Sequence, residues 1–225
     1  AKYEPDTNVE DQSLIAIERS DTQADSFKPG WIEIHGLELR NAHPDFSYTR
    51  QTGGATDAYG TGAAAIFMRG ADNVRLTNCV IHHCAQGILT NNGGNNEAGL
   101  VRELRIDRCH FHSQGSVVPG TYWGQNVRTQ GVGIVIEYCR FDPPLSGTSV
   151  VNVEDRSAGF IARCNWIEGG GSQLDLAEPF SALALLTGDP AWSTAHVIGN
   201  VLRSFSSGAG TMVQFGGSEI SGART

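Results

Sequence analysis

Long apolar segments are missing from this chain of 225 residues. No stretch approaches the roughly 18 consecutive apolar residues that a membrane-spanning helix needs, so we expect no membrane span. The first residues, 1–6, also lack the apolar core of a secretory signal peptide. We therefore expect that the chain either begins at a mature N-terminus or belongs to a longer protein.

The short motifs of several other classes are missing as well. There is no CxxC pair and no Cys/His finger spacing, which argues against a zinc finger. There is no glycine-rich phosphate loop, Walker pattern or serine nucleophile elbow. A formal net charge of −8 without a basic stripe disfavours nucleic acid as a partner, although a local basic cleft stays open.

The composition that is present favours a β protein with many tight turns. Charged residues are sparse, at 18%, whereas glycine is abundant, at 28 residues. Helical periodicity indicates at most one short turn, at residues 182–186. Predicted loops are residues 43–62, 91–99, 113–124 and 180–194.

One six-residue motif, called the phrase below, recurs along the chain. Its first residue is apolar, its fourth is usually small, and its sixth is aromatic or aliphatic. A fixed phrase with variable spacers is typical of a solenoid whose coils differ in loop length. The copies begin at Ile34, Leu76, Ile106, Ile136, Ile161 and Val197, and they end at Leu39, Ile81, Phe111, Phe141, Trp166 and Leu202. These two sets are expected to form ladders of like residues in a stacked parallel sheet.

A second set of strands is predicted from apolar alternation, which would give each coil two main strands. These strands are residues 14–17, 65–68, 87–90, 126–129, 150–153, 173–176 and 212–215. A β-propeller would need four strands per blade, a leucine-rich repeat would show its Leu/Asn signature, and a β-sandwich would not keep the columns aligned. We therefore predict an all-β, right-handed parallel β-helix of about six to seven coils, forming a single domain over residues 1–225.

Four of the five cysteines occupy the same place in the phrase: Cys79, Cys109, Cys139 and Cys164, but not Cys84. If they form one interior column, neighbours lie about 4.8 Å apart, which permits a disulfide without requiring one. We interpret them as buried reduced thiols that act as small hydrophobic side chains. They therefore say little about the redox compartment.

Three motifs carry a family resemblance. They are Val153-Glu154-Asp155-Arg156-Ser157-Ala158-Gly159, then Arg163-Cys164-Asn165-Trp166-Ile167-Glu168-Gly169-Gly170, and Gln173-Leu174-Asp175-Leu176. They are similar to the K-D-R-S-A-G, R-Y-N-W-I-E-G-G and Q-L-D-L motifs of bacterial secreted right-handed parallel β-helix repeat proteins, relatives of the pectate-lyase-like superfamily. The resemblance covers about residues 31–217, most specifically 154–176. It implies an extracellular or periplasmic protein with a polysaccharide-related role, and further coils, caps or end-to-end association at both ends.

By analogy with the fold, a sugar chain is expected on the outward face of the first strands. The candidate substrate-binding residues there are Asn126, Arg128, Asn152, Glu154, Glu178 and Gln214, and the candidate catalytic residues are Asp155, Arg156 and Asp175. Hydrolysis needs two carboxylates, which Asp155 and Asp175 would supply, and a nearby like charge would raise the pKa of one of them. β-Elimination needs a base, for which Arg128 and Arg156 are available. It also needs neutralisation of the sugar carboxylate, for which Glu154 and Asp175 are potential Ca²⁺ ligands.

Departures from the family pattern weigh against catalysis. Glu154 stands where the family often has Lys, and Gln125 and Gln214 stand where it tends to have His. The Asn-Lys-Ser phrase that carries the base in the branch of chondroitinase B and alginate lyases is also missing. These losses remove the side chains best able to move protons near neutral pH. A structural interpretation stays open, in which Asp155 and Arg156 brace a turn and Asp175 hydrogen-bonds to the backbone or to Arg156.

His82, His112 and Asp142 each occupy the same place after the phrase, so we expect them to stack at one corner of the coils. Such a set has ligands for a transition metal, but we interpret it as a solvated polar ladder and predict no metal. The tryptophans Trp31, Trp123 and Trp192 lie near loops or strand edges, where each could stack on a sugar ring or pack in the core.

Two functional hypotheses follow. The first is a carbohydrate-active protein that binds an acidic or neutral polysaccharide on the first-strand face, with cleavage by a lyase or hydrolase reaction left open. The second is a non-catalytic structural or adhesive β-helix of a cell surface or filament. No cofactor is assigned, and Ca²⁺ is an option only for the lyase reaction.

Overall fold

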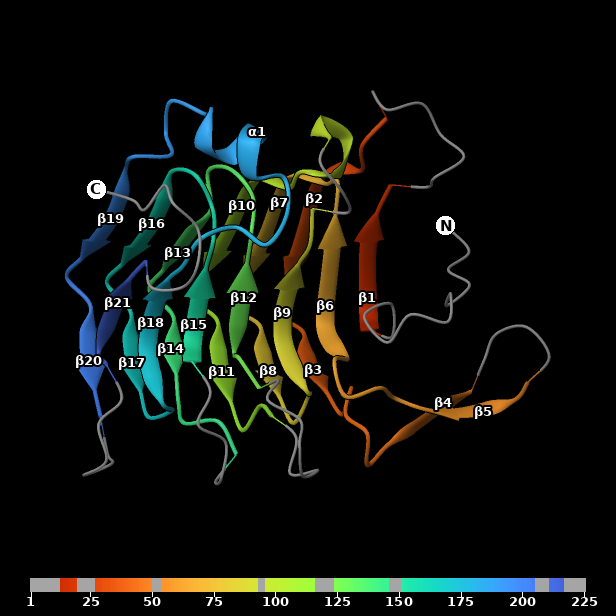
Figure 1. The fold of residues 1–225 in the computed structure, drawn as a ribbon. Helices are drawn as coiled ribbons and strands as arrows, with labels where there is room; N and C mark the ends of the chain where they lie inside the picture. Colours follow the sequence, from red (N-terminus) through yellow and green to blue (C-terminus); the bar gives the residue numbers. More distant parts are fainter. Residues whose placement is uncertain are drawn as a thin grey trace.

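The computed structural model describes residues 13–19, 27–49, 54–92, 96–115, 124–145, 151–204 and 211–216. These residues wind into a right-handed parallel β-helix (Figure 1). In Figure 1 the chain rises through the front sheet, crosses to the back, descends, and advances towards the C-terminal end with each turn. The predicted fold class is therefore confirmed.

The first parallel sheet, sheet A, contains every one of the predicted first strands. Its order within the described residues is β1 (Ser13–Glu18), β6 (Ala64–Arg69), β9 (Gln86–Thr90), β12 (Val127–Thr129), β15 (Val151–Asp155), β18 (Ser172–Leu176) and β21 (Val213–Phe215). Neighbours in this order come from successive coils, because each strand pairs in parallel with the strand one coil earlier and one coil later. Strands distant in sequence therefore become vertical neighbours.

The repeated phrase forms two sheets rather than one, so each coil has three strands where two were predicted. Sheet B, in the order of the described strands, is β19 (Ala195–Ile198), β16 (Phe160–Arg163), β13 (Val135–Glu137), β10 (Arg102–Asp107), β7 (Asp72–Thr77) and β2 (Gly30–His35). Sheet C is β20 (Val201–Arg203), β17 (Trp166–Glu168), β14 (Arg140–Phe141), β11 (His110–His112), β8 (Val80–His82) and β3 (Glu38–Arg40).

A left-handed backbone residue divides each copy of the phrase between sheets B and C. The residues with positive φ at this corner are Gly36, Asn78, Arg108, Tyr138, Cys164 and Gly199. One residue in this conformation turns the chain sharply, which ends the strand of sheet B and begins the strand of sheet C. Apolar alternation alone does not reveal such a corner, because the apolar residues on both sides of it point inward.

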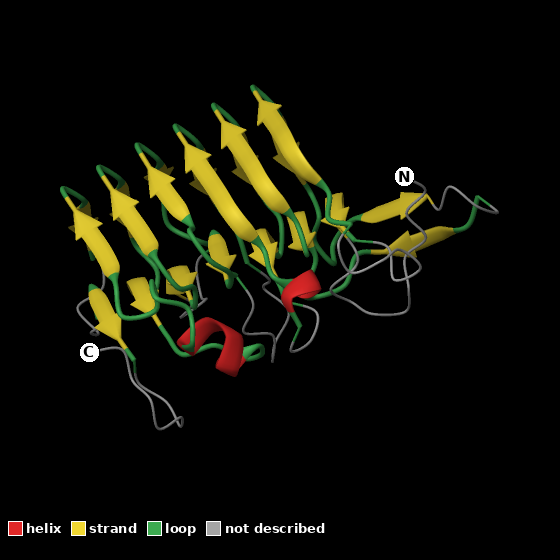
Figure 2. Cartoon of the chain, turned by 90° about the horizontal axis from the view of Figure 1, so that it is seen from above, coloured by secondary structure: helices red, strands yellow, loops and turns green. Residues whose placement is uncertain are grey.

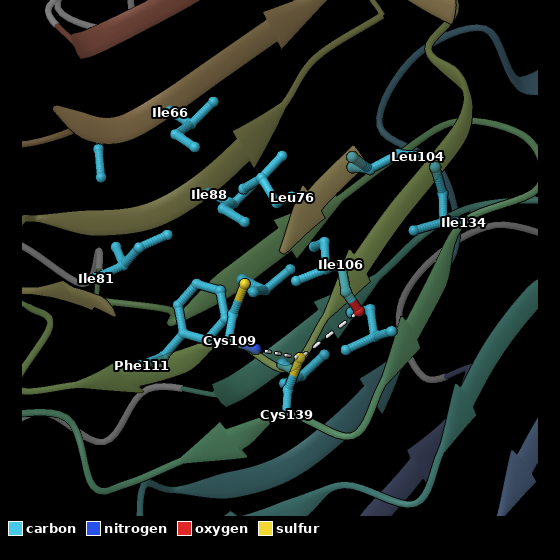
Figure 3. Close-up of a cluster of buried hydrophobic side chains, with 14 of the residues drawn as sticks. Ile66, Leu76, Ile81, Ile88, Leu104, Ile106, Cys109, Phe111, Ile134 and Cys139 are labelled. Atoms are coloured by element: carbon cyan, nitrogen blue, oxygen red, sulfur yellow. Dashed lines mark hydrogen bonds between the residues drawn. The ribbon is translucent and has the colours of Figure 1, made fainter. Parts of the chain in front are cut away.

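The interior is a stack of like side chains (Figure 3). The rings of Phe111 and Phe141 are stacked with centroids 4.9 Å apart and an interplanar angle of 11°. Beside them, the Cys109 backbone N–H donates to the Cys139 sulfur at 3.4 Å. Cys79, Cys109 and Cys139 are free, buried thiols in one column, as predicted. Burial raises the pKa of Cys84, which lies elsewhere in the core, to about 12.

The prediction for the fourth cysteine is wrong by one residue. Asn165, not Cys164, continues the cysteine column, because its Oδ1 accepts the Cys139 N–H at 2.9 Å. In the same coil, Ala162 and not Ile161 pairs with Ile136, and Ile167 and not Trp166 pairs with Phe141. Apolar residues occupy both alternatives in this coil, so the pattern fits two registers, and a one-residue shift reverses which side chains face inward. Cys164 is exposed as a result.

Among the described residues, three small elements lie outside the coils. An antiparallel hairpin, β4 (Ser47–Thr49) and β5 (Thr56–Ala58), projects at the N-terminal end where a loop was predicted (Figures 1 and 2). A 3-10 helix covers Glu97–Gly99. The short helix α1 (Leu183–Thr187) confirms the predicted helical turn. Its Leu186 is buried with Leu100, Trp192 and Ala182 in a small cluster of its own.

Candidate functional site

The outward residues of sheet A form one row across the coils. The strand register places Ala16, Phe67, Leu89, Arg128, Glu154, Asp175 and Gln214 side by side. The row is apolar in the early coils and becomes charged from Arg128 onward. The predicted outward positions of Arg128, Glu154, Asp175 and Gln214 are therefore confirmed.

Three other candidates face the interior, contrary to the prediction. Asn126 and Asn152 have no exposed surface, and the Asn126 amide donates to the Asn152 Oδ1 at 2.7 Å. Each amide also donates to a backbone carbonyl, that of Asp142 for Asn126 and that of Glu168 for Asn152. Such buried amides satisfy the backbone at the corner between sheets C and A. They cannot contact a ligand on the outer face.

Asp155 is the third inward candidate. It is fully buried, and its two oxygens accept hydrogen bonds from the Thr129 hydroxyl at 2.9 Å and the Ser157 N–H at 3.0 Å. These contacts tie the end of β15 to β12, which agrees with the turn brace of the structural interpretation. Asp155 is therefore not on the outer face where a hydrolytic pair with Asp175 would need it.

A pocket of about 300 Å³ lies where the strands of sheet A end. Its charged walls are Arg128 and Arg156, and its apolar walls are Leu89 and Phe180. The guanidinium carbon lies 4.5 Å from the centroid of the Phe180 ring for Arg128 and 3.5 Å for Arg156. Contacts of this kind attract a cation to the face of the ring and fix the plane of the guanidinium.

The path of the chain after β18 brings Phe180 to this pocket. The Phe180 N–H donates to the Gln130 side-chain oxygen at 2.7 Å, and the Gln130 amide donates to Ser181 at 2.9 Å. Gln130 is itself held by Thr90, whose hydroxyl bonds to the Gln130 backbone. The segment therefore crosses back over the two preceding coils, and Phe180 remains 64% exposed above them.

Glu154 holds the two arginines from below. Its Oε1 lies 2.6 Å from Arg156 Nε and 3.5 Å from Arg128 Nε, and its Oε2 accepts from the Gln125 amide at 2.9 Å. The Arg156 guanidinium also donates to the backbone carbonyl of Glu178. With both oxygens of Glu154 occupied, this carboxylate orients cations and is poorly placed to activate a water.

Asp175 is the carboxyl group with an altered pKa in this region. Its pKa is raised from 3.8 to about 6, mainly by burial and also by the charges of Glu154 and Glu178, while the charge of Arg156 acts in the opposite direction. Its buried Oδ1 has no hydrogen-bond partner among the described residues, so the predicted bond to the backbone or to Arg156 is not seen at this atom. A carboxyl group with this pKa holds its proton in mildly acidic solution.

The carboxylates do not form a prepared calcium site. Among the described residues, Glu154, Asp175 and Glu178 do not bring three carboxylate oxygens within 4.8 Å of one another, whereas one group of histidines does bring its nitrogens that close. Calcium would also have to displace Arg156 from Glu154. The potential Ca²⁺ ligands Glu154 and Asp175 therefore do not fit that ion in this arrangement.

Comparisons with protein-family models, with curated proteins and with solved structures find no match to this chain. The parallel β-helix is established by its strand order, while the resemblance to pectate-lyase relatives stays a prediction. Neither helix of the described residues has the length and apolar character that crossing a bilayer requires.

A second polar group lies on sheet C. His112 pairs with His82 in the register, and their rings are stacked 4.6 Å apart at 8°, as the predicted ladder requires. Asp142 keeps its predicted place next to His112, because Phe141 pairs with Phe111 in the register, but its carboxylate bonds to His110 Nε2 and Arg140 Nε, both at 2.7 Å. His83, which the sequence pattern missed, joins the two stacked rings instead. Burial and then the charge of His82 lower the pKa of both His83 and His112.

The tryptophans differ in their surroundings. Trp31 is 88% exposed and borders a hollow of about 420 Å³ on the outer face of sheet B, together with Arg75 and Glu103. Trp192 is buried in the small cluster beside α1, separate from the main core of the coils. Trp123 lies outside the described residues.

The sequence interpretation also missed Phe180, Gln130 and Gln125 as parts of the site. Phe180 was assigned to a loop, and its one signal was an isolated aromatic residue four positions after the end of β18 at Leu176. Gln125 was noticed only as a departure from the family pattern, whereas its amide is a partner of Glu154.

Proposed function

We propose that this protein binds an acidic polysaccharide on the outer face of sheet A. Arg128 and Arg156 hold the carboxylate of a uronate residue, and the exposed part of Phe180 and Leu89 contact its ring. The observation that carries the proposal is the pair of guanidiniums fixed against Phe180 in a pocket that no carboxylate lines. Planar guanidiniums match the geometry of a carboxylate, which favours an acidic sugar over a neutral one.

Cleavage is proposed to be hydrolytic and to take place beside the pocket, at Asp175 on the neighbouring strand β18. A proton donor for the leaving oxygen must stay protonated at the working pH, and the raised pKa of Asp175, about 6, meets this need. Glu178, whose charge acts on Asp175, is the second carboxylate of the proposal. The lyase alternative would use an arginine as base, but the Arg156 guanidinium is engaged in an ion pair with Glu154. We also propose that the protein is extracellular or periplasmic, because such polymers occur there.

Calorimetric titration with matched acidic and neutral oligosaccharides tests the binding. Arg128→Gln and Arg156→Gln should each weaken binding of the acidic oligosaccharide by about 10- to 100-fold, because each removes a charge-assisted hydrogen bond. Arg203→Gln is the matched control, since Arg203 is exposed on β20, away from the pocket. Equal affinity for neutral oligosaccharides, or unchanged affinity in both pocket variants, would contradict the proposal.

Cleavage is tested separately by measuring reducing ends and the ultraviolet absorbance of unsaturated uronate products. Hydrolysis predicts new reducing ends without the absorbance, and Asp175→Asn should abolish them while binding persists. A rise in absorbance would favour the lyase reaction instead. If neither binding nor cleavage is found, the remaining hypothesis is a structural or adhesive β-helix that associates end to end, and sedimentation velocity measures that association.

A further inference from the structure

Three histidines gather at the corner after sheet C, about which the proposed function says nothing. One ring nitrogen each of His82, His83 and His112 lies within 4.8 Å of the others. His82 ends β8 and His112 ends β11, the neighbouring strand in the register, and His83 follows directly in the turn. The parallel stacking of two coils therefore brings together imidazoles that are 30 positions apart in the chain, as the numbering of His82 and His112 gives.

The hydrogen bond of His82 to Glu38 directs its other ring nitrogen at His83. His82 Nε2 lies 3.0 Å from the Glu38 carboxylate, so the proton of the neutral ring is on Nε2 and Nδ1 carries the lone pair. That Nδ1 faces the Nδ1 of His83 at 2.6 Å. Two lone pairs at this distance repel, so the present separation fits a proton shared between the two nitrogens, and a metal ion would need them about 3.3 Å apart. A carboxylate that accepts from the far nitrogen is also the usual partner of a metal-bound histidine.

We propose that His82, His83 and His112 bind one divalent transition-metal ion of the Zn²⁺ class, with Glu38 orienting His82. Imidazole nitrogens are preferred ligands of such ions, and three protein ligands leave a fourth position for water. Zinc–nitrogen bonds of about 2.0–2.1 Å place tetrahedral ligand atoms about 3.3 Å apart. The His82 Nδ1–His83 Nδ1 separation of 2.6 Å is shorter than this value, and all three ligand atoms lie within 4.8 Å of one another, so rotation of the rings about χ2, which is a soft torsion, suffices to reach it.

The neighbouring charges define the ligand set more closely. Asp142 is bound to His110 and Arg140, so the carboxylate expected in this site is directed elsewhere. Arg40 lies 3.6 Å from Glu38, which balances part of the negative charge near His82. The site is therefore built from neutral nitrogen ligands, which favours zinc, nickel or copper over calcium or magnesium.

Equilibrium dialysis of the tag-free chain against ZnCl₂ tests the proposal, with one ion bound per chain expected. The double variant His82→Ala/His112→Ala should weaken binding by more than about 100-fold, because it removes two of three ligands. His196→Ala is the matched control, since His196 is exposed on β19 of sheet B. Calcium at the same concentration should not compete.

Two further measurements keep the result independent of folding defects. Glu38→Gln leaves all three ligands in place and should weaken zinc binding by about 10- to 100-fold. Co²⁺ in place of Zn²⁺ should give the visible spectrum of a tetrahedral site without a sulfur-to-metal band. Failure of the unaltered chain to take up zinc, unchanged binding in the double variant, or a thiolate band from the cysteines would each overturn the proposal.

Discussion

Asp155 and Asp175 lie on neighbouring strands of sheet A, yet their side chains have opposite orientations and different surroundings. Asp155 points inward, is fully buried, and has a hydrogen-bond donor on each oxygen. Asp175 points outward beside Glu154, and its pKa is raised to about 6. Position along the strand decides the difference, because successive side chains of a strand face opposite sides.

The inner and outer faces of sheet A differ in the same way along their other polar residues. Inside, polar groups such as Asn126 and Asn152 are paired with each other and with the backbone, so they hold the coils together. Outside, like charges are left near one another, with Arg156 as the group that offsets them. Unfavourable electrostatics of this kind is common at functional sites, because it shifts the pKa of a carboxyl group towards the pH at which the group must exchange a proton. The inner face therefore supplies stability and the outer face supplies chemistry.

The largest contrast is expected for phenylalanine. Phe111→Ala empties a fully buried position that stacks on Phe141, and it should lower the free energy of unfolding by about 3–5 kcal/mol. Phe180→Ala on the outer face should cost less than about 1 kcal/mol, because it loses only contacts with two arginines. Urea unfolding of both variants measures the difference. Equal losses would mean that the inner stack does not dominate stability.

Asp155→Ala should have the next largest effect, a loss of about 2–4 kcal/mol, because the Thr129 hydroxyl and the Ser157 N–H lose their buried acceptor. Thermal and urea unfolding at neutral pH provide the measurement. Asp155→Asn, which keeps one acceptor oxygen, is the control and should recover part of the loss. A neutral effect of Asp155→Ala would contradict the brace.

The pH dependence of stability should separate Asp175 from Asp155. The folded-state pKa of Asp175 is raised from 3.8 to about 6, so its stabilising contribution is present below pH 4 and is lost as the pH rises through about 6. Asp175→Asn should therefore remove a decline of about 1 kcal/mol between these values, a figure reduced for partial solvent exposure. Urea midpoints of both chains across this range, compared as a difference, measure it. Parallel curves would show that Asp175 titrates normally.

Substitution of the exposed cysteine should give the smallest change in stability, but the exposed and buried thiols should differ clearly in their reactivity. Cys164 is exposed and the other four thiols are buried, so a thiol reagent should label one cysteine in the folded protein and five after denaturation. Cys164→Ser should abolish the labelling of the folded protein and change stability by less than about 0.5 kcal/mol. Labelling of Cys139 in the folded state would place it outside the interior column.

Much of the fold could be predicted from periodicity. Strands such as β15, β18 and β21 were expected at their observed places, because apolar residues alternate with polar ones there. The corner between sheets B and C was not foreseen, since residues as different as Gly36 and Tyr138 adopt the same positive φ. The offset at Cys164 was missed because two apolar residues side by side, Ile161 and Ala162, fit either register.

Periodicity predicted only some of the residues of the candidate site. Arg128, Glu154 and Asp175 follow from alternation and coil stacking, both of which are encoded locally. Asp155 was misassigned because its charge suggested an outward position, whereas two buried donors make an inward one favourable. Phe180 and His83 could not be predicted, because no period applies to a loop or a turn.

By itself, the sequence determined that the chain winds into a β-helix and which strands stack, because side-chain parity and repeated phrases act within a few residues. Only the tertiary structure decided which groups meet across coils: Phe180 over Arg156, Asp175 beside Glu154, and His112 on His82. The reason is physical. The local backbone sets whether a side chain points inward or outward. Which side chains of different coils come into contact depends on loop paths and strand register, and these are selected by the packing of the whole stack.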